Sequence, residues 1–334
     1  MGVTLPPLLH LSAAQVSAAM PPIDERLRLA ERTLVALADG SAQLPPKIAV
    51  HPRPADSFGH AMPAHLRGAD PSGADDLVGM KWVVGYPDNG TLGLPTILAI
   101  VVMNDPATGL PVALLDGTPI TAARTAAVSG VAIRRFAPVV VGRPVRVGLI
   151  GAGVQGRSHV EVVGHVLPGA ELTIFDPGRD RAEALAAVAH TTHGFASARV
   201  ASGAREAVQN ADVVITAASF GPVNQVMTTD WLAPDALVVP VDYATYCHAG
   251  VARQASLFLV DEVGQFLANR DAGLFEAYPD PTSAIGAAIV AGVERPAHGR
   301  VVTTHLGTGL ADLVFGAAIL ATATGAGIGT PLPR

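Results

Sequence analysis

Gly151-Ala152-Gly153-Val154-Gln155-Gly156 reads G-x-G-x-x-G and directly follows the apolar run 145–150. The branched residues of that run predict a buried parallel strand, and the glycines predict a tight turn into a helix. Such glycines allow a sharp bend, a close backbone approach to a pyrophosphate and close packing of helix on strand. The helix N-terminus then faces the anion. We therefore predict a dinucleotide site that includes Gly151, Gly153, Val154, Gln155 and Gly156.

Asp176 ends the next predicted strand, 171–175, at the spacing where a dinucleotide site places a carboxylate on the ribose hydroxyls. The same carboxylate would repel a 2′-phosphate, so we expect NAD, with NADP as the less favoured cofactor. Arg179 and Arg181 keep NADP open, because an arginine can accommodate that phosphate. Asp176 could also be a helix N-cap ahead of Pro177, which does not exclude the ribose role.

Composition narrows the class of protein. The chain has 334 residues, 49% of them hydrophobic and 15% charged, with a net charge of -6. This length fits two domains, and the charge gives no reason to expect nucleic acid or an anionic membrane as partner. The single cysteine, Cys247, excludes an internal disulfide and suits the cytoplasm. Residues 1–6 lack the basic start and long apolar core of a signal peptide, and the apolar stretch 310–323 is too short to span a bilayer.

Two kinds of segment follow one another along the chain. Residues 23–39 predict a helix ended by Gly40, 45–120 predict an antiparallel sheet, and Thr121 to Phe136 predict another helix. From Val145 onward strands alternate with helices, which indicates a doubly wound parallel sheet. The expected strands are 145–150, 171–175, 212–217, 237–241 and 257–260. We expect an α/β protein with a Rossmann domain at 138–302 and a discontinuous α+β domain formed by 1–137 and 303–334.

Lys81 lies in a predicted strand whose two faces differ. The bulky face, predicted to be core, carries Val78, Met80, Trp82, Val84 and Tyr86. Lys81 lies on the other face between Gly79 and Gly85, so a ligand could approach the backbone beside one cation. A lysine that simply faces solvent is the alternative.

Arg124 and Asp242 are the other two charged candidates. With Thr121 as N-cap, Arg124 would lie in the first helical turn, where a cation opposes the helix dipole. A substrate carboxylate, a cofactor phosphate, or structural pairing with Asp116 or Asp105 would compensate it. Asp242 follows the strand 237–241, at the edge where open parallel sheets bind ligands, and could be a general base or only a turn former.

Several further residues are weaker candidates. Thr216 and Ala217 end the predicted strand 212–217 and would lie near the ribose and nicotinamide. His60 and His305 lie in polar or glycine-rich settings, and His305 could face the same crevice or be structural. No pair among His60, His248 and His305 has the helical spacing of metal ligands and the chain has no H-E-x-x-H motif, so we expect no metal site.

The chain resembles the ornithine cyclodeaminase and mu-crystallin family over most of its length. The residues that carry the resemblance are Met62-Pro63, Gly79-Met80-Lys81, Pro87-Asp88-Asn89, Gly93-Leu94-Pro95, Thr108-Gly109-Leu110-Pro111, Asp116-Gly117, the segment 121–129, the glycine turn and the segment 306–312. The resemblance implies a homodimer whose first domain, completed by the C-terminal helix, supplies both the subunit contact and the substrate pocket. It also implies that Lys81 and Arg124, with Lys47 where the family often has arginine, bind a substrate carboxylate.

The resemblance further implies proton transfer at an amino group by Asp242. Two positions depart from the ornithine cyclodeaminases: His60 stands where they carry a glutamate, and His305 replaces the usual serine. The residues after Asp242 differ as well, and the lost carboxylate makes ornithine a doubtful substrate.

We therefore expect NAD(H)-dependent hydride transfer at the alpha carbon of a small amino or imino acid, catalysed with Asp242 and Lys81. His60 or His305 could help Asp242 to move the proton. The alternatives are cyclodeamination of a diamino acid with release of ammonia, and a cofactor-binding protein without turnover.

Overall fold

The computed structural model describes residues 5–219 and 224–334. Residues 1–4, which belong to the segment 1–6 that lacks the features of a signal peptide, lie outside the described residues. The chain divides into two compact units. The first unit runs to Arg124 and resumes at Gly307–Arg334, and the second is Thr125–Leu306. The boundaries expected from the sequence were 137/138 and 302/303, and that domain assignment stays a prediction.

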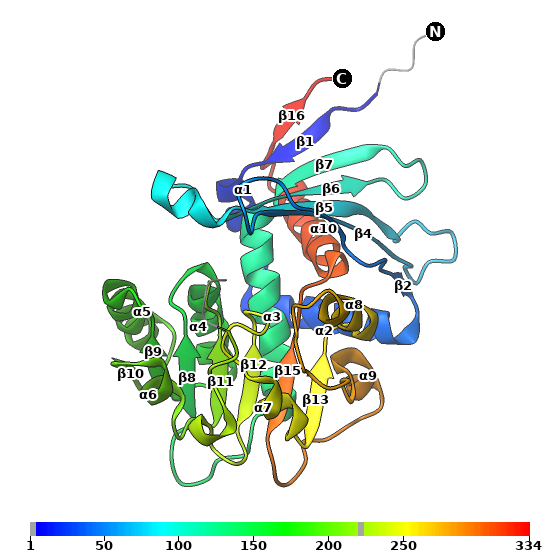
Figure 1. Cartoon of the computed structure of the whole chain (residues 1–334). Coiled ribbons are helices and arrows are strands. Elements are labelled where there is room, and N and C mark those ends of the chain that lie inside the picture. The colour runs from blue at the N-terminus through cyan, green and yellow to red at the C-terminus, as the bar shows by residue number, and fades with distance from the viewer. Residues whose placement is uncertain (1–4, 220–223) are drawn as a thin grey trace. The chain divides into compact units, whose positions relative to one another are not determined.

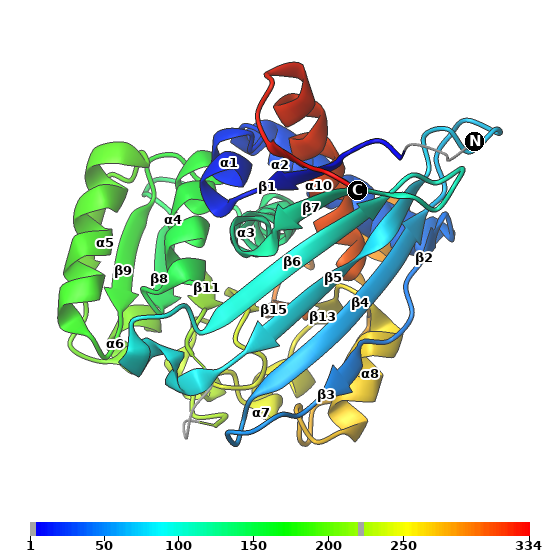
Figure 2. The same cartoon turned by 90° about the horizontal axis from the view of Figure 1, so that it is seen from above.

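The first unit is built on a mixed sheet in the order β16-β1-β7-β6-β5-β4-β2, with β3 paired to β4. Its central strands pair antiparallel, as the sequence predicts, whereas β1 runs parallel to β7. Figure 2 shows β4, β5, β6 and β7 side by side. The strands are β1 (Leu8–Leu11), β2 (Ala42–Gln43), β3 (Ile48–Val50), β4 (Phe58–Leu66), β5 (Leu77–Gly85), β6 (Ile97–Asn104), β7 (Pro111–Asp116) and β16 (Thr330–Leu332).

One face of this sheet is covered by α10 (Gly309–Gly325), which packs on β4, β5 and β6. The apolar sequence of α10 makes it a core helix, and α2 (Ile23–Asp39) packs against it in turn. The predicted helix 23–39 and its stop at Gly40, in the left-handed conformation with φ 78°, are both confirmed. The unit also contains α1 (Ala13–Ala18) and the 3-10 helix η1 (Pro87–Leu92).

The two faces of β5 are the reverse of what the sequence predicts. Lys81 is 1% exposed on the face that α10 covers, whereas Trp82 is 39% exposed on the other. Gly79 permits this packing, because a Cβ there would lie 2.2 Å from the carbonyl oxygen of Val102 and 3.1 Å from Leu313. The glycine face of the strand is therefore core, and the bulky face is half-buried in the single chain, with Trp82 exposed.

The second unit is a parallel sheet in the order β10-β9-β8-β11-β12-β15-β13-β14 (Figure 1), which confirms the doubly wound prediction. Strands 171–175 and 257–260 have the predicted bounds, and the other expected strands are one or two residues shorter. The strands are β8 (Arg146–Ile150), β9 (Glu171–Phe175), β10 (Ser197–Val200), β11 (Val213–Thr216), β12 (Leu237–Pro240), β13 (Leu257–Val260), β14 (Ser283–Ala284) and β15 (Val301–Thr304).

Helices connect these strands. They are α4 (Val154–Val166), α5 (Arg179–Thr192), α6 (Ala204–Val208), η2 (Thr229–Trp231), α7 (Ala249–Arg253), α8 (Val263–Asp271) and α9 (Ile285–Val290). The strands that lie in the middle of the sheet are buried on both faces, as expected for strands covered by helices on both sides. In the described part of the chain no helix is both long and apolar enough to cross a membrane.

The helix α3 (Gly117–Phe136) begins earlier than the sequence predicts. Asp116 accepts a hydrogen bond from the backbone N–H of Thr118 at 2.9 Å, and the Thr121 hydroxyl donates to the carbonyl of Gly117 at 2.7 Å. Thr121 is thus inside the helix and is not its cap. Arg124 consequently lies beyond the first turn, so the predicted opposition to the helix dipole does not arise.

Candidate active site

The glycine turn between β8 and α4 has the geometry that a dinucleotide needs. Gly151 has φ 103°, and a Cβ on it would lie 2.4 Å from the carbonyl oxygen of Ala217. A Cβ on Gly156 would lie 2.0 Å from the carbonyl oxygen of Gly151, so the helix packs on the turn itself. A Cβ on Gly153, in contrast, would meet no described atom within 4 Å. The turn is therefore closely packed at Gly151 and Gly156 and open at Gly153, which fits a phosphate-binding loop.

Asp176 braces this loop from the end of β9. One carboxylate oxygen, Oδ2, accepts the backbone N–H of Ala152 at 2.8 Å. The other, Oδ1, accepts the N–H of Gly178 at 2.7 Å and a guanidinium N–H of Arg181 at 2.6 Å. Burial pushes the pKa of Asp176 up, but these hydrogen bonds outweigh it and hold the pKa below its usual value. The N-cap of α5 is Gly178, so the alternative of Asp176 as that N-cap is wrong.

Asp242 follows β12 and is buried against the end of β11. Its Oδ1 accepts a hydrogen bond from the Thr216 hydroxyl at 2.7 Å, and its Oδ2 accepts the Ala218 N–H at 3.2 Å. Burial raises the pKa of Asp242 to about 7, although both hydrogen bonds oppose the rise. A carboxyl group with this pKa can give or take a proton near neutrality, as a catalytic acid or base must. The bond to Asp242 also explains why Thr216 ends its strand with a polar side chain.

Lys81, Arg124 and Asp312 form a buried charge cluster in the first unit. Asp312 lies in the first turn of α10, with Oδ2 2.5 Å from Nζ of Lys81 and Oδ1 3.2 Å from Nε of Arg124. Burial lowers the pKa of Lys81 to about 7, although the charge of Asp312 acts in the opposite direction. The anion that compensates Arg124 within the protein is therefore Asp312, and the alternatives Asp116 and Asp105 are wrong.

Gly307 gives the guanidinium of Arg124 its space. It has φ 77°, and a Cβ on it would lie 2.3 Å from Nη1 of Arg124. Two cations share one carboxylate in this cluster, so at full protonation it keeps one uncompensated positive charge. A buried positive charge favours binding of an anion.

His60 lies on β4 close to this cluster. Burial, together with the charges of Lys47, His51 and Lys81, lowers the pKa of His60 to about 4. His60 is therefore neutral at neutral pH, and it stacks on Phe58 with ring centroids 4.6 Å apart. Lys47 and Lys81 are near enough to act on the same ring, which is consistent with one cationic region in this unit.

His305, at the end of β15, takes part in a hydrogen-bonded chain that sequence reasoning missed. The Ser129 hydroxyl lies 2.8 Å from Nε2 of His305 and 2.8 Å from Nε2 of His159. Nδ1 of His159 lies 2.7 Å from the carbonyl oxygen of Gln155, the second residue of α4. All three side chains are buried, and burial lowers the pKa of His159 to about 4.

The carbonyl oxygen of Gln155, at the end of this chain, fixes the direction of the hydrogen bonds. A carbonyl only accepts, so Nδ1 of the neutral His159 donates to Gln155 and its Nε2 accepts from the Ser129 hydroxyl. The Ser129 oxygen in turn accepts from Nε2 of His305. His305 is therefore held in one tautomer, and the network joins the cofactor helix α4 to the carboxyl end of β15.

The structure brings the predicted residues together in two groups. Lys81, Arg124 and His60 belong to the first unit, while the glycine turn, Asp176, Thr216, Asp242 and His305 belong to the second. The residues that sequence reasoning missed are Asp312, Ser129 and His159. For Asp312 a signal existed, because it is the single charge in the apolar stretch 310–323. Among the described residues, no group of three or more His, Cys, Asp or Glu side chains could hold a metal ion.

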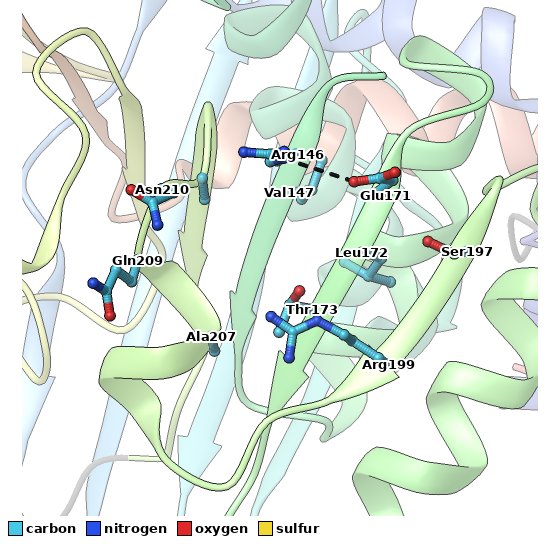
Figure 3. A pocket seen from close by; sticks show the side chains of 11 residues that line it. Arg146, Val147, Glu171, Leu172, Thr173, Ser197, Arg199, Ala207, Gln209 and Asn210 are labelled. Carbon is cyan, nitrogen blue, oxygen red and sulfur yellow. Dashed lines mark ion pairs between the residues drawn. The ribbon is translucent and has the colours of Figure 1, made fainter. Parts of the chain in front are cut away.

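A hollow of about 290 Å³ lies elsewhere in the second unit (Figure 3). It is formed near the amino-terminal ends of β8, β9 and β10, and Arg146 and Glu171 pair across it at 3.7 Å. Parallel sheets bind ligands at the opposite, carboxyl edge. Its charged side chains are also about half exposed. Within the second unit, this hollow therefore lies at the edge of the sheet opposite to the glycine turn, Asp176 and Asp242.

The sequence profile of the ornithine cyclodeaminase/mu-crystallin family matches residues 11–263. The nodulation efficiency protein NfeD of Rhizobium meliloti is 33% identical over 330 residues, 97% of this chain and 98% of that protein. The ketimine reductase mu-crystallin of Mus musculus is 33% identical over 198 residues, 59% of this chain and 58% of that protein.

Among solved structures, the Δ(1)-pyrroline-2-carboxylate reductase of Thermococcus litoralis, in complex with NADH and L-proline, is similar with a TM-score of 0.81. The identity is 26%, and the match covers 97% of this chain and 100% of that chain.

Proposed function

Because the chain belongs to the ornithine cyclodeaminase/mu-crystallin family, we propose that it is an NAD(H)-dependent oxidoreductase acting on a small amino or imino acid. The observation that carries the proposal is the buried cluster of Lys81, Arg124 and Asp312, with two cations and one carboxylate. Relatives with reductase names, among them the mouse ketimine reductase mu-crystallin, support the same chemistry.

The cluster binds the carboxylate of the substrate. Arg124 offers its remaining N–H groups and Lys81 its ammonium, while Asp312 holds both cations in place. Lys47 adds positive charge to the same region, since the charges of Lys47 and Lys81 both lower the pKa of His60. Fixing the carboxylate orients the alpha carbon, which is the atom that a hydride must reach.

The glycine turn and Asp176 hold the dinucleotide. The turn at Gly151, Gly153 and Gly156 takes the pyrophosphate at the start of α4, with Val154 and Gln155 in its first turn. Asp176 takes the ribose, and Thr216 with Ala217 lies at the end of β11 on the same edge of the sheet. When bound, the nicotinamide supplies the hydride for reduction of the C=N bond, or accepts it in the reverse direction.

Asp242 moves the proton. In the reductive direction a hydride adds to the alpha carbon and a proton to the nitrogen, and the imino acid becomes an amino acid. Thr216 and the Ala218 N–H orient the carboxyl group, and burial brings its pKa to about 7, so that it can supply this proton at neutral pH. His60 and His305 remain proposed substrate-side residues.

Cyclodeamination is the second candidate, and Asp242 favours it because that reaction also needs proton transfer at the amino group. The neutral His60 speaks against a diamine substrate, since an ammonium group would need a carboxylate partner. Asp312, the carboxylate of the cluster, is already bound by Lys81 and Arg124.

We propose a homodimer through the exposed face of the first unit's sheet. Ile48, Trp82 and Ile100 are all exposed and follow one another in register, with Ala61 between the first two. A contiguous apolar row of this kind marks a protein contact. A cytoplasmic location, inferred from the single cysteine, belongs to the same proposal.

The test offers the protein NADH and a panel of cyclic and acyclic imino acids. Oxidation of NADH is measured as the loss of its absorbance. The proposal expects turnover with at least one of the imino acids, and expects Asp242→Asn to lower turnover by about 10² or more. NADH that binds tightly without turnover of any panel member would contradict it. Ammonia release from a diamino acid at constant NADH would select cyclodeamination instead.

A further inference from the structure

We propose that Arg181 opens the cofactor site to NADPH as well as NADH, so that this arginine sets the cofactor selectivity. The proposal rests on the proposed function only in that a dinucleotide binds at the glycine turn. It goes beyond the expectation from the sequence, in which Asp176 favoured NAD and both Arg179 and Arg181 kept NADP open.

Arg181 lies over the turn that joins β9 to α5. Its Nη2 lies 2.6 Å from Oδ1 of Asp176, and its guanidinium passes so close to Gly178 that a Cβ there would lie 2.7 Å from Cζ. Glycine at position 178 therefore leaves the room through which the arginine reaches back to the carboxylate.

The acceptor sites of Asp176 are largely in use. Each carboxylate oxygen has about two lone-pair sites. Both sites of Oδ1 are taken, by the N–H of Gly178 and by Arg181, and one site of Oδ2 is taken by the N–H of Ala152. One acceptor site remains for two ribose hydroxyls. The carboxylate of Asp176 thus binds mainly the loop and Arg181. It should therefore discriminate between NADH and NADPH less than a carboxylate with free acceptor sites would.

The charge at this corner is also balanced. An unpaired carboxylate would repel the 2′-phosphate of NADPH, but Arg181 neutralises Asp176. The side chain of Asp176 is 7% exposed and that of Arg181 is 57% exposed, so the guanidinium stands on the solvent side of the pair. A guanidinium has five N–H donors, enough to keep Asp176 and bind a phosphate at the same time.

Arg179 serves as the matched control. It lies two positions earlier on the same helix, is similarly exposed, and pairs with Glu183 at 2.7 Å. Arg179 binds Glu183, whereas the arginine on Asp176 is Arg181. Replacing Arg179 removes one positive charge from the same turn without touching the Asp176 pair.

The experiment measures dissociation constants of NADH and NADPH by nicotinamide fluorescence for the full-length wild type, Arg181→Ala and Arg179→Ala. We expect the wild type to bind both cofactors, and Arg181→Ala to weaken NADPH binding by about tenfold or more, the loss typical of a hydrogen bond to a charged group. The dissociation constant of NADH should change by less than about threefold, because NADH carries a neutral 2′-hydroxyl where NADPH carries the phosphate. Arg179→Ala should leave the ratio of the two constants near that of the wild type.

Adenosine 2′,5′-bisphosphate and adenosine 5′-monophosphate differ only in the 2′-phosphate, and their use as competitors of NADH gives a second readout without the nicotinamide. The 2′-phosphate should improve competition in the wild type and in Arg179→Ala and lose that advantage in Arg181→Ala. Binding of NADH alone by the wild type, or an unchanged NADPH to NADH ratio in Arg181→Ala, would overturn the role of Arg181 and leave the proposed function intact. Binding of neither dinucleotide would overturn both.

Discussion

The carboxylate of Asp312 lies 2.5 Å from the ammonium of Lys81, and the two side chains are 0% and 1% exposed. Burial of two charges is tolerated when they are paired, and removal of one leaves the other uncompensated in a medium of low polarity. Arg124 shares the same carboxylate, so Asp312 is the counter-ion of two cations and balances one of their two positive charges. The stability of the first unit and its anion affinity therefore depend on one residue.

Asp312→Asn should destabilise the protein by about 3 kcal/mol or more, because two buried cations lose their counter-charge. The free energy of unfolding in urea measures this. Asp280→Asn is the control, since Asp280 is 81% exposed and pairs with Arg270 at the surface. That variant should lose less than about 1 kcal/mol. Equal losses in the two variants would show that Asp312 is not a special counter-ion.

Asp242 should make the protein less stable as the pH rises from about 4 to about 7. Its pKa is about 7 in the folded protein against the ordinary 3.8, so over this range the folded state holds a proton that the unfolded state has lost. The stability that this proton provides is complete below the ordinary pKa and disappears as the pH passes the folded pKa. The upper limit is roughly 4 kcal/mol for a shift of this size.

In Asp242→Asn this pH dependence is absent, because the amide does not titrate. Urea unfolding of both proteins at several pH values between 4.5 and 8 would show the variant gaining on the wild type as the pH rises. Two curves that stay parallel over the range would contradict the raised pKa.

Ser129→Ala should cost about 1–3 kcal/mol, because two buried imidazole nitrogens lose their hydroxyl partner. Thr33→Val is the matched control: Thr33 is also buried, but its hydroxyl only donates to the carbonyl of Leu29 within α2 at 2.9 Å. Helix backbone bonding satisfies that carbonyl without the threonine. ¹⁵N shifts of the His159 ring provide an independent readout, and a protonated Nε2 in the wild type would contradict the direction of the chain.

Ile100→Glu should convert the proposed dimer into a monomer, because a carboxylate in the middle of the apolar row must be desolvated in the contact. Sedimentation velocity measures the change in mass. Leu92→Glu is the control, since Leu92 is 72% exposed in η1, outside the strands that carry the row, and should leave the mass unchanged. A wild-type monomer at micromolar concentration, or an Ile100→Glu protein that remains dimeric, would contradict the assignment of this face.

The cofactor half of the fold could be predicted because its signals are local. The G-x-G-x-x-G turn, the branched strands and the position of Asp176 all lie within a short stretch, and the structure has β9 and β13 at the predicted bounds. Parallel strands in such a sheet are buried on both faces, so no decision about which face is core was needed.

The substrate side depends on contacts that are distant in sequence. Which face of β5 is buried is decided by α10, more than two hundred residues later, and the bulky residues around Trp82 were therefore assigned to the wrong face. The start of α3 was misplaced because Asp116-Gly117 also fits a turn, whereas Asp116 in fact caps the helix. The single charge in the apolar stretch 310–323 marked Asp312, but nothing local showed that it pairs with Arg124, and the chain from Ser129 to the two histidines had no local signal.

Lys81 and Trp82 are neighbours in the chain that serve opposite faces of β5, and this sets a limit on how the protein can be altered. A strand alternates with a period of two, so insertion or deletion of a single residue would exchange the two faces. It would move the ammonium out of the core and the indole into it. Length variation in this protein should therefore be confined to the connections 67–76 and 86–96, the second of which contains η1, with the strand between them kept at constant length.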